Sequence, residues 1–323
     1  MNKNNLFSKL ETYIQKKGLI TDGAPLIIGL SGGPDSVFLL HFLAHLKNNK
    51  NLHLIVAHLD HEWRTTSKQD AQFCKALADS YNLDFVCKTI AELNLNLKFN
   101  GSKEEIGRKA RRTFFESLAA QHNASGIVLA HHADDQMETF FIRMVRGASL
   151  TGLAGMKAKD GLYIRPLLEI KKDQIVAYLK ENNLSFVIDE SNNSDAFLRN
   201  RIRNTVIPAL REVDNRFDNR FEHTHAQLQA AHEFIESAAQ QALEKVIDDS
   251  GALHASELYS LHPVLKNRIL IEWLCKHKVP FVPSHGLLEE LLKFLKQSHD
   301  GTHIFYNRWM VVKKGALARI VHF

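Results

Sequence analysis

A short apolar strand that turns directly into an apolar helix constrains this chain more than any other feature of its sequence. Residues 26–30 read Leu-Ile-Ile-Gly-Leu, and Ser-Gly-Gly at 31–33 joins them to the helical pattern of residues 36–48. Glycine permits left-handed turns and lets an anion approach the backbone closely. A helix that begins near Pro34 directs unpaired N–H groups and its positive dipole end toward the same point. The segment therefore predicts a phosphate-binding turn.

Apolar strands alternate with helical patterns beyond this segment. Such alternation is typical of a parallel sheet with helices on both faces, so we predict an α/β fold with a doubly wound, mainly parallel sheet. The strand candidates are residues 26–30, 52–59, 84–89, 126–130 and 162–164. The helix candidates are residues 6–17, 36–48, 67–81, 103–121, 134–146 and 171–182.

The character of the sequence changes after Pro208. A highly charged segment at 211–220 leads into a long helical pattern at 221–248, and further helical patterns and short strands follow. A length of 323 residues suits two domains. We predict residues 1–212 as the domain with the sheet, and residues 213–323 as a smaller, mostly helical domain that ends in a β-hairpin.

Composition and charge narrow the functional classes. The net charge of +5 and the pI of about 9.0 favour a polyanionic partner such as nucleic acid. The three cysteines are scattered, which argues against a disulfide framework and against a zinc or iron–sulfur site. The N-terminus lacks the apolar core of a signal peptide, and no apolar run approaches the roughly 20 residues that span a bilayer. We therefore expect a cytoplasmic protein without a membrane segment.

The loop lacks the lysine of the common Gly-x-x-x-x-Gly-Lys-Ser/Thr nucleotide loop. A Ser-Gly-Gly string alone is most often a turn or a helix cap. Here, however, the complete string Ser-Gly-Gly-x-Asp-Ser lies in the first strand-to-helix turn, where open parallel sheets bind nucleotides. It resembles the loop of the N-type ATP pyrophosphatases, which split ATP into AMP and pyrophosphate by adenylating an oxygen. The resemblance implies an adenine nucleotide α-hydrolase-like sheet and a loop that holds the leaving pyrophosphate. The residues implied to bind ATP are Ser31, Gly32, Gly33, Pro34, Asp35 and Ser36.

A second polar cluster, residues 57–64, ends the second strand candidate. The carboxyl end of such a strand borders the ligand crevice, so these side chains are expected to face the nucleotide. His58, Asp60 and His61 are conceivable metal ligands, but alternation along a strand sends neighbouring side chains to opposite faces, which favours a polar rim over a zinc site. In the resembling family a His-x-x-His-x-x-Arg string lies beside the adenosine, which implies that His61 and Arg64 bind near ATP.

A third cluster, residues 130–139, joins another strand to its helix. Asp134 or Asp135 can cap that helix, and one acidic residue in a first turn is ordinary. Asp135 and Glu138, however, are three residues apart on one helical face that is directed at the crevice. Two carboxylates near a triphosphate imply Mg²⁺, an ammonium substrate, or both.

Four further strings follow in order, at residues 146–156, 165–168, 189–192 and 199–204. Taken singly, the first is typical of a glycine-rich loop and the last of a solvated basic helix. Taken together after the ATP loop, they resemble the N-terminal domain of the tRNA(Ile)-lysidine synthetase family, and the helical part resembles that family's first C-terminal domain. The resemblance covers essentially the full chain. The chain ends without the additional C-terminal domain of longer relatives, which predicts a short form of the family.

The resemblance implies an ATP-dependent RNA modification. The C2 oxygen of the wobble cytidine in a CAU-anticodon isoleucine tRNA is adenylated and pyrophosphate leaves. The ε-amine of L-lysine then attacks C2 and expels AMP, which makes lysidine. The implied cofactors and partners are ATP, Mg²⁺, L-lysine and tRNA(Ile), with residues 213–323 as the tRNA-binding domain, and the sequence also allows a homodimer.

The residue types suit this chemistry. A carboxylate such as Asp135 or Glu138 can hold the cationic side chain of lysine and accept its proton. An arginine can hold the α-carboxylate in a bidentate pair, and Arg199 and Arg203 are available. By its spacing from the acidic cluster, Arg203 is the better match to the family's essential arginine. We predict Asp35, Asp135, Glu138 and Arg203 as catalytic residues, with Asp35 and Asp135 as Mg²⁺ ligands.

Residues 107–112 depart from the family pattern Ala-Arg-x-x-Arg-Tyr. Gly107 and Arg112 stand in place of the alanine and the tyrosine, whereas Arg108 and Arg111 remain. We therefore predict that the two retained arginines face the tRNA or the lysine, and that the stacking role of a tyrosine is lost.

Other functions compete with this one. A tRNA 2-thiolase also adenylates its substrate, but such enzymes typically carry paired cysteines, which this sequence lacks. A GMP or asparagine synthetase needs a glutaminase part with a nucleophilic cysteine. A basic tRNA-binding protein with a degenerate ATP site is a different class, and the intact loop and both carboxylates of the third cluster argue against it.

Overall fold

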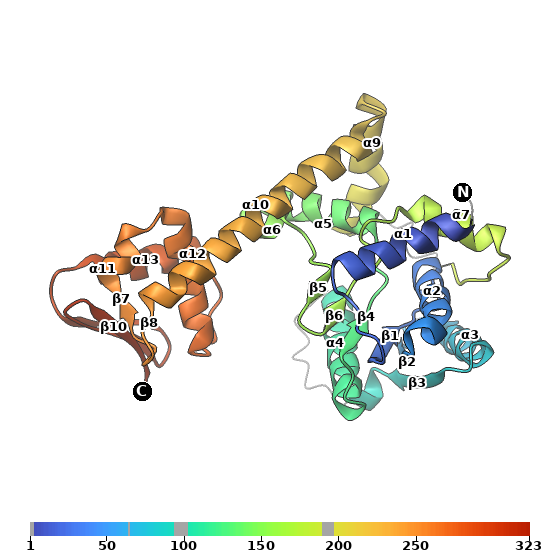
Figure 1. Ribbon diagram of the computed structural model, residues 1–323, viewed down its shortest axis with the longest axis horizontal. Helices are drawn as coiled ribbons and strands as arrows, with labels where there is room; N and C mark the ends of the chain where they lie inside the picture. Colours follow the sequence, from blue (N-terminus) through green and yellow to red (C-terminus); the bar gives the residue numbers. More distant parts are fainter. Residues whose placement is uncertain (1–2, 64, 94–102, 189–196) are drawn as a thin grey trace. The chain divides into compact units, whose positions relative to one another are not determined.

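The computed structural model describes residues 3–63, 65–93, 103–188 and 197–323. The chain divides into two compact units, Met1–Asp218 and Asn219–Phe323 (Figure 1). Within the described residues, no helix combines the length and the apolar character that crossing a membrane requires.

A six-stranded sheet forms the centre of the first unit, in the order β3-β2-β1-β4-β6-β5. Five strands are parallel, and only β5 at the edge runs antiparallel to its neighbour. The predicted doubly wound, mainly parallel sheet is therefore confirmed. The strands are β1 (Pro25–Gly29), β2 (His53–Asp60), β3 (Asp84–Thr89), β4 (Gly126–Val128), β5 (Lys159–Asp160) and β6 (Tyr163–Ile164).

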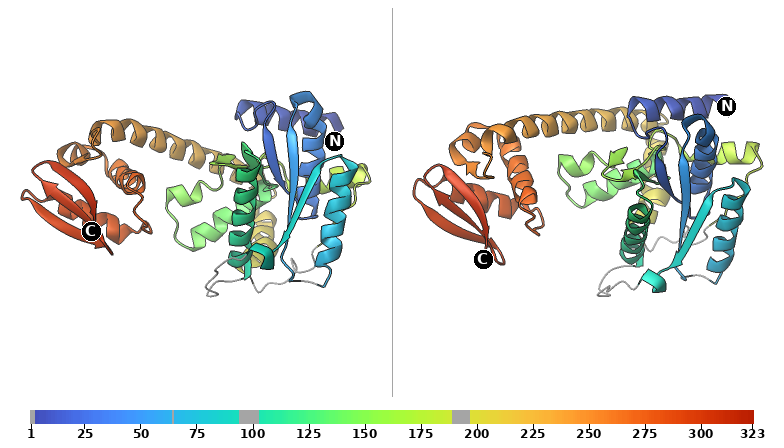
Figure 2. Two further views of the ribbon diagram at one scale, coloured as in Figure 1. Left: turned by 90° about the horizontal axis from the view of Figure 1, so that it is seen from below. Right: turned by 60° about the horizontal axis from the view of Figure 1, so that its bottom comes forward.

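Helices cover both faces of this sheet (Figure 2). Side chains alternate between the faces along β1, where Leu26 and Ile28 pack with the helices α1, α2, α3 and α7, and Ile27 packs with α4. All three are fully buried, as expected for a parallel strand covered on both faces. The helices of the unit are α1 (Lys3–Lys16), α2 (Pro34–Lys50), α3 (Ser67–Ser80), α4 (Lys103–Gln121), α5 (Ala133–Val145), α6 (Leu150–Leu153), α7 (Lys172–Glu181), α8 (Leu198–Arg201) and α9 (Ile207–Val213), with a 3₁₀ turn at Ala91–Leu93.

The second unit combines helices with an antiparallel sheet of four strands in the order β7-β10-β9-β8. The fully buried Trp273 lies in its core with Leu270, Leu291, Val311 and Ala318. A smaller second domain of mostly helical character is thus confirmed, with a larger sheet than the predicted hairpin. Its elements are α11 (Ala255–Ser260), α12 (Pro263–Lys276), α13 (His285–Lys296), β7 (Leu253–His254), β8 (Gly301–Tyr306), β9 (Trp309–Lys314) and β10 (Leu317–His322), and the long helix α10 (Phe217–Val246) precedes them.

Candidate functional site at the carboxyl edge of the sheet

The two glycines in the turn between β1 and α2 have different backbone conformations. Gly32 has a φ of +83°, and a Cβ there would lie 3.3 Å from both Cys74 Sγ and Val187 Cγ2. Gly33 has a φ of −68° and is the residue before the first helical residue, Pro34. The left-handed backbone therefore requires glycine at position 32, whereas position 33 has ordinary extended geometry.

Hydroxyl groups close this turn on itself. The buried Ser36 Oγ donates to the carbonyl oxygen of Gly33 at 2.9 Å and accepts from the backbone N–H of Ser31 at 3.2 Å. The Ser31 and Ser36 hydroxyl oxygens are also 3.2 Å apart. From outside the turn, the N–H of Val187 donates to the carbonyl oxygen of Gly32 at 2.9 Å. The first turn of α2 is thereby held with its free N–H groups at the edge of the sheet.

The cluster at the end of β2 supports the turn between β1 and α2. His58 is buried, and its Nδ1 lies within hydrogen-bond distance, 2.8 Å, of the carbonyl oxygen of Leu30. His61 stacks on Trp63, with ring centroids 4.6 Å apart. A Cβ at Gly107 would lie 2.8 Å from the Trp63 ring and 3.2 Å from His61 Cε1, so glycine on α4 makes room for this ring pair. Arg64, also predicted to bind near ATP, lies outside the described residues.

The carboxylates of the third cluster lie in the first turns of α5. Asp135 accepts a hydrogen bond from the N–H of His132 at 3.0 Å and so caps the helix. Glu138 is only 1% exposed, which is rare for a carboxylate without partners. The prediction that the two share one face of the helix agrees with their common arginine partner.

Two arginines from a distant segment bind these carboxylates. Arg199 donates to Asp135 at 2.7 Å and to Glu138 at 2.6 Å. Arg203 donates twice to Glu138, at 2.5 and 3.1 Å. Arg199 belongs to α8, and Arg203 to the π-helical turn Ile202–Val206 that follows it. The structure thus brings together four of the predicted residues in one network, and π-turns of this kind occur often at functional sites.

The network sets the protonation of its members. Burial raises the pKa of Asp135, but His132 and Arg199 outweigh burial and hold that pKa below its usual value. Burial lowers the pKa of His131 to about 4; Asp135 opposes this shift, while the nearby Arg165, Arg199 and Arg111 add to it. Near neutral pH, Asp135 is therefore an anion and His131 a neutral imidazole.

Asp35 has a partner that the sequence did not indicate. Lys172, the first residue of α7, donates from Nζ to both carboxylate oxygens of Asp35, at 2.5 Å from Oδ1. His132 Nε2 lies 3.7 Å from Asp35 Oδ2 and 3.5 Å from Asp135 Oδ2. Asp35, which follows β1, and Asp135, which follows β4, therefore both lie beside the buried imidazole of His132.

The arginines of α4 lie at the margin of this network. Arg108 and Arg111 are exposed. Arg108 is close enough to Arg143 and Arg165 to add to the lowering of their pKa values that burial begins. Arg112, which replaces the tyrosine of the family pattern, pairs instead with Glu116 at 2.8 Å.

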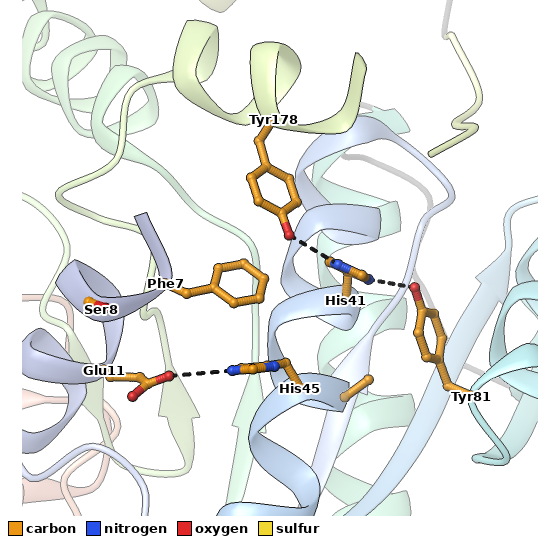
Figure 3. A pocket seen from close by; sticks show the side chains of 8 residues that line it. Phe7, Ser8, Glu11, His41, His45, Tyr81 and Tyr178 are labelled. Carbon is orange, nitrogen blue, oxygen red and sulfur yellow. Dashed lines mark hydrogen bonds and ion pairs between the residues drawn. The ribbon is translucent and has the colours of Figure 1, made fainter. Parts of the chain in front are cut away.

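A separate hollow lies between α1, α2 and α7 and has a volume of about 420 Å³ (Figure 3). His41 lines it, 2.6 Å from the hydroxyl of Tyr81 and 3.1 Å from that of Tyr178. Both ring nitrogens are thus engaged by tyrosines that fasten the end of α3 and α7 to α2. The residues that line this hollow pack the helices against one another, and none of them belongs to the network above.

The chain is similar in sequence to known proteins. The family model of the PP-loop domain matches residues 3–210. A tRNA(Ile)-lysidine synthase of Bacillus cereus is 30% identical over 311 residues, which cover 92% of this chain and 65% of the relative. A tRNA(Ile)-lysidine synthase of Bacillus subtilis is 34% identical over 304 residues, which cover 90% of this chain and 63% of the relative. The chain thus spans somewhat less than two thirds of the length of these relatives.

The fold has a counterpart among solved structures. The U34-tRNA thiolase NcsA of Methanococcus maripaludis superposes with a TM-score of 0.57 at 16% sequence identity, over 71% of this chain and 81% of that chain. At this identity the similarity concerns the fold alone.

Proposed function

Since this chain belongs to the PP-loop family, whose domains use ATP, we propose that it carries out the reaction for which its Bacillus relatives are named, the formation of lysidine in tRNA(Ile). One observation carries the proposal. An intact PP-loop lies beside a buried pair of carboxylates, Asp135 and Glu138, and this pairing supplies a place for ATP and a place for an ammonium substrate. A reaction on tRNA further implies a cytoplasmic protein.

The first step takes place at the turn Ser31–Ser36. ATP adenylates the C2 oxygen of the wobble cytidine, and pyrophosphate leaves with its negative charge toward the N–H groups at the start of α2. These groups are already held in place by the Ser31–Ser36 hydroxyl contacts, so they stabilise the leaving charge without reorganising.

The carboxylates suit Mg²⁺. Among the residues that the structure describes, no three His, Cys, Asp or Glu side chains gather as a metal cage. Mg²⁺ does not need one, because it usually takes one or two carboxylates together with phosphate oxygens and water. Asp35 and Asp135, both next to His132 Nε2, fit that donor set. They would hold the ion, which supplies positive charge to the phosphates when bound.

The second step uses the network around Glu138. The ε-ammonium of L-lysine takes a place beside Asp135 and Glu138, and a carboxylate there accepts the proton that the amine must lose before it attacks C2. Arg199 or Arg203, displaced from the carboxylates, then meets the α-carboxylate of the substrate. The ε-ammonium thus takes the place of one guanidinium at the carboxylates, and that guanidinium takes the α-carboxylate of the substrate.

Two parts of the chain are proposed to contact the tRNA. We assign these contacts to the second unit and to the exposed Arg108 and Arg111 on α4, which stand at the margin of the site. A net charge of +5 agrees with a polyanionic partner.

Sulfur transfer is the less suitable chemistry for this chain. Burial raises the pKa of Cys74 to about 12, and burial also raises the pKa values of Cys87 and Cys275. The thiolate is the reactive form of cysteine, so these thiols are poor nucleophiles near neutral pH.

The test is a reconstitution with the purified chain, ATP, Mg²⁺, L-lysine and unmodified CAU-anticodon tRNA(Ile). We expect pyrophosphate release that requires the tRNA, and incorporation of labelled lysine into it. Turnover without lysine but with sulfide would contradict the proposal. No pyrophosphate release under any of these conditions would indicate a tRNA-binding protein instead.

A further inference from the structure

The PP-loop lacks a lysine of its own, yet the fold brings one to it. Lys172 Nζ donates to both carboxylate oxygens of Asp35, which is the second residue of α2 and lies within the loop motif. The two residues are 137 positions apart in the chain. Their side chains are 38% and 25% exposed, so the ammonium group is accessible from the solvent side of the turn.

Backbone contacts fix where Lys172 begins. Its N–H donates to Asp134 Oδ2 at 2.8 Å, and the N–H of Ala133 donates to the carbonyl oxygen of Ile170 at 2.9 Å. The start of α7 is therefore bound to the start of α5. From there the side chain of Lys172 crosses to the start of α2, so its ammonium lies where the two strand-to-helix turns face each other.

Stability alone does not account for this pair. A partly exposed ion pair contributes only about 0–1 kcal/mol to folding, because water screens it and two side chains lose freedom. The electrostatics of the loop give it a role. A phosphate that approaches the N–H groups of α2 meets the negative charge of Asp35, and the ammonium beside that carboxylate offsets the repulsion. Lysine binds phosphate in this way, as a compact point charge.

We propose that Lys172 binds the pyrophosphate end of ATP and so supplies, from α7, the phosphate-binding ammonium that the loop lacks. Without nucleotide, Asp35 holds this ammonium. When ATP binds, the ammonium turns from the carboxylate to oxygens of the β- and γ-phosphates, and it stays with pyrophosphate as that group leaves. The proposal rests on the proposed function only in requiring that the loop takes ATP.

Binding measurements on the full chain test it. Dissociation constants for ATP, pyrophosphate and AMP are measured for the wild type, Lys172→Met, Lys172→Arg and the neighbouring control Lys171→Met, with Mg²⁺ and with EDTA. We expect Lys172→Met to weaken ATP and pyrophosphate about tenfold, the effect of one lost hydrogen bond to a charged group, and to leave AMP unchanged. Lys172→Arg should restore most of the affinity, and Lys171→Met should bind all three ligands like the wild type.

Three outcomes would overturn the proposal. They are unchanged pyrophosphate affinity in Lys172→Met, an equal loss for AMP and pyrophosphate, and an equal loss in Lys171→Met. Thermal unfolding of each variant is recorded alongside, and Lys172→Gln replaces Lys172→Met if the latter does not unfold cooperatively. A wild type that shows the expected ligand pattern but forms no lysidine would refute the proposed function while it supports the role of Lys172.

Discussion

Two strand-to-helix turns follow the paired strands β1 and β4, one leading into α2 and the other into α5. Different kinds of contact stabilise the two turns. The first depends on the backbone, through the left-handed Gly32 and hydroxyl bonds that stay within residues 31–36. The second depends on charged side chains, whose partners Arg199 and Arg203 come from 61 to 65 residues further along the chain. The contacts that shape the first turn thus come mostly from a short string, whereas the contacts of the second turn are assembled by the fold.

Replacing Glu138 by Gln tests the second turn most strongly. The variant keeps the shape of the side chain but leaves Arg199 and Arg203 without its charge. We expect lysidine formation to fall by more than about a hundredfold, and the free energy of unfolding to fall by about 2 kcal/mol, less than for a fully buried pair because both arginines are about a third exposed. Urea unfolding and lysine incorporation measure the two effects.

Glu116, whose side chain is 40% exposed, is the matched control for this variant. It pairs with Arg112 on α4 and accepts a hydrogen bond from the hydroxyl of Tyr163 at 3.1 Å. Because glutamine keeps an acceptor oxygen for Tyr163, Glu116→Gln should change the free energy of unfolding by less than about 0.5 kcal/mol. Affinity for tRNA should stay nearly unchanged in Glu138→Gln and in Asp135→Ala. A large loss of tRNA binding would mean that these carboxylates support the structure rather than the lysine.

Replacing Gly32 by Ala tests the first turn. Its φ of +83° costs a residue with a Cβ about 1–2 kcal/mol, and the new methyl group would press on Val187 and Cys74. We expect a loss of that size in the free energy of unfolding, together with weaker ATP binding. Gly33→Ala, at a φ of −68°, should change the free energy of unfolding by less than about 0.5 kcal/mol. Equal effects at the two positions in denaturant titrations would refute the backbone account.

Replacing Ser36 by Ala removes the hydroxyl that closes the first turn. Since its Oγ is buried and contacts Ser31 and Gly33, we expect a loss of about 1–2 kcal/mol in unfolding free energy. Ser31→Ala should cost less, because Ser31 is exposed. If Ser31→Ala proves the more harmful in thermal unfolding, the hydroxyl of Ser36 does not hold the turn.

Arginines that follow the network are expected to show the smallest effects. Arg211 already pairs with Asp134 and Asp218, and Arg216 pairs with Asp214. Neutralising either of them, or Arg220, should weaken tRNA binding and measurably reduce the slope of log affinity against log salt concentration, by no more than about 1. Filter binding at several salt concentrations measures the slope. An unchanged slope would remove these arginines from the tRNA footprint.

The contrast between the two turns also explains how far the sequence predicted the structure. Strand and helix periods are local, so the parallel sheet and the helix at 103–121 were predictable. The edge strand β5 was not, because its two exposed residues carry no hydrophobic pattern. In the site, the Ser-Gly-Gly string was recognisable from the sequence alone, whereas Arg199 and Arg203 were found through the family resemblance. Lys172 has no local signal, because only the fold brings it to Asp35.

The separation between Glu138 and its arginines has a consequence for synthesis. At about 5–20 residues per second, a ribosome adds Arg199 roughly 3–12 seconds after Glu138, which lies 61 residues earlier. A nascent chain can therefore complete its phosphate turn while the carboxylates of α5 still have no guanidinium partners. The carboxylates of α5 gain these ion-pair partners only after Arg199 and Arg203 have been translated.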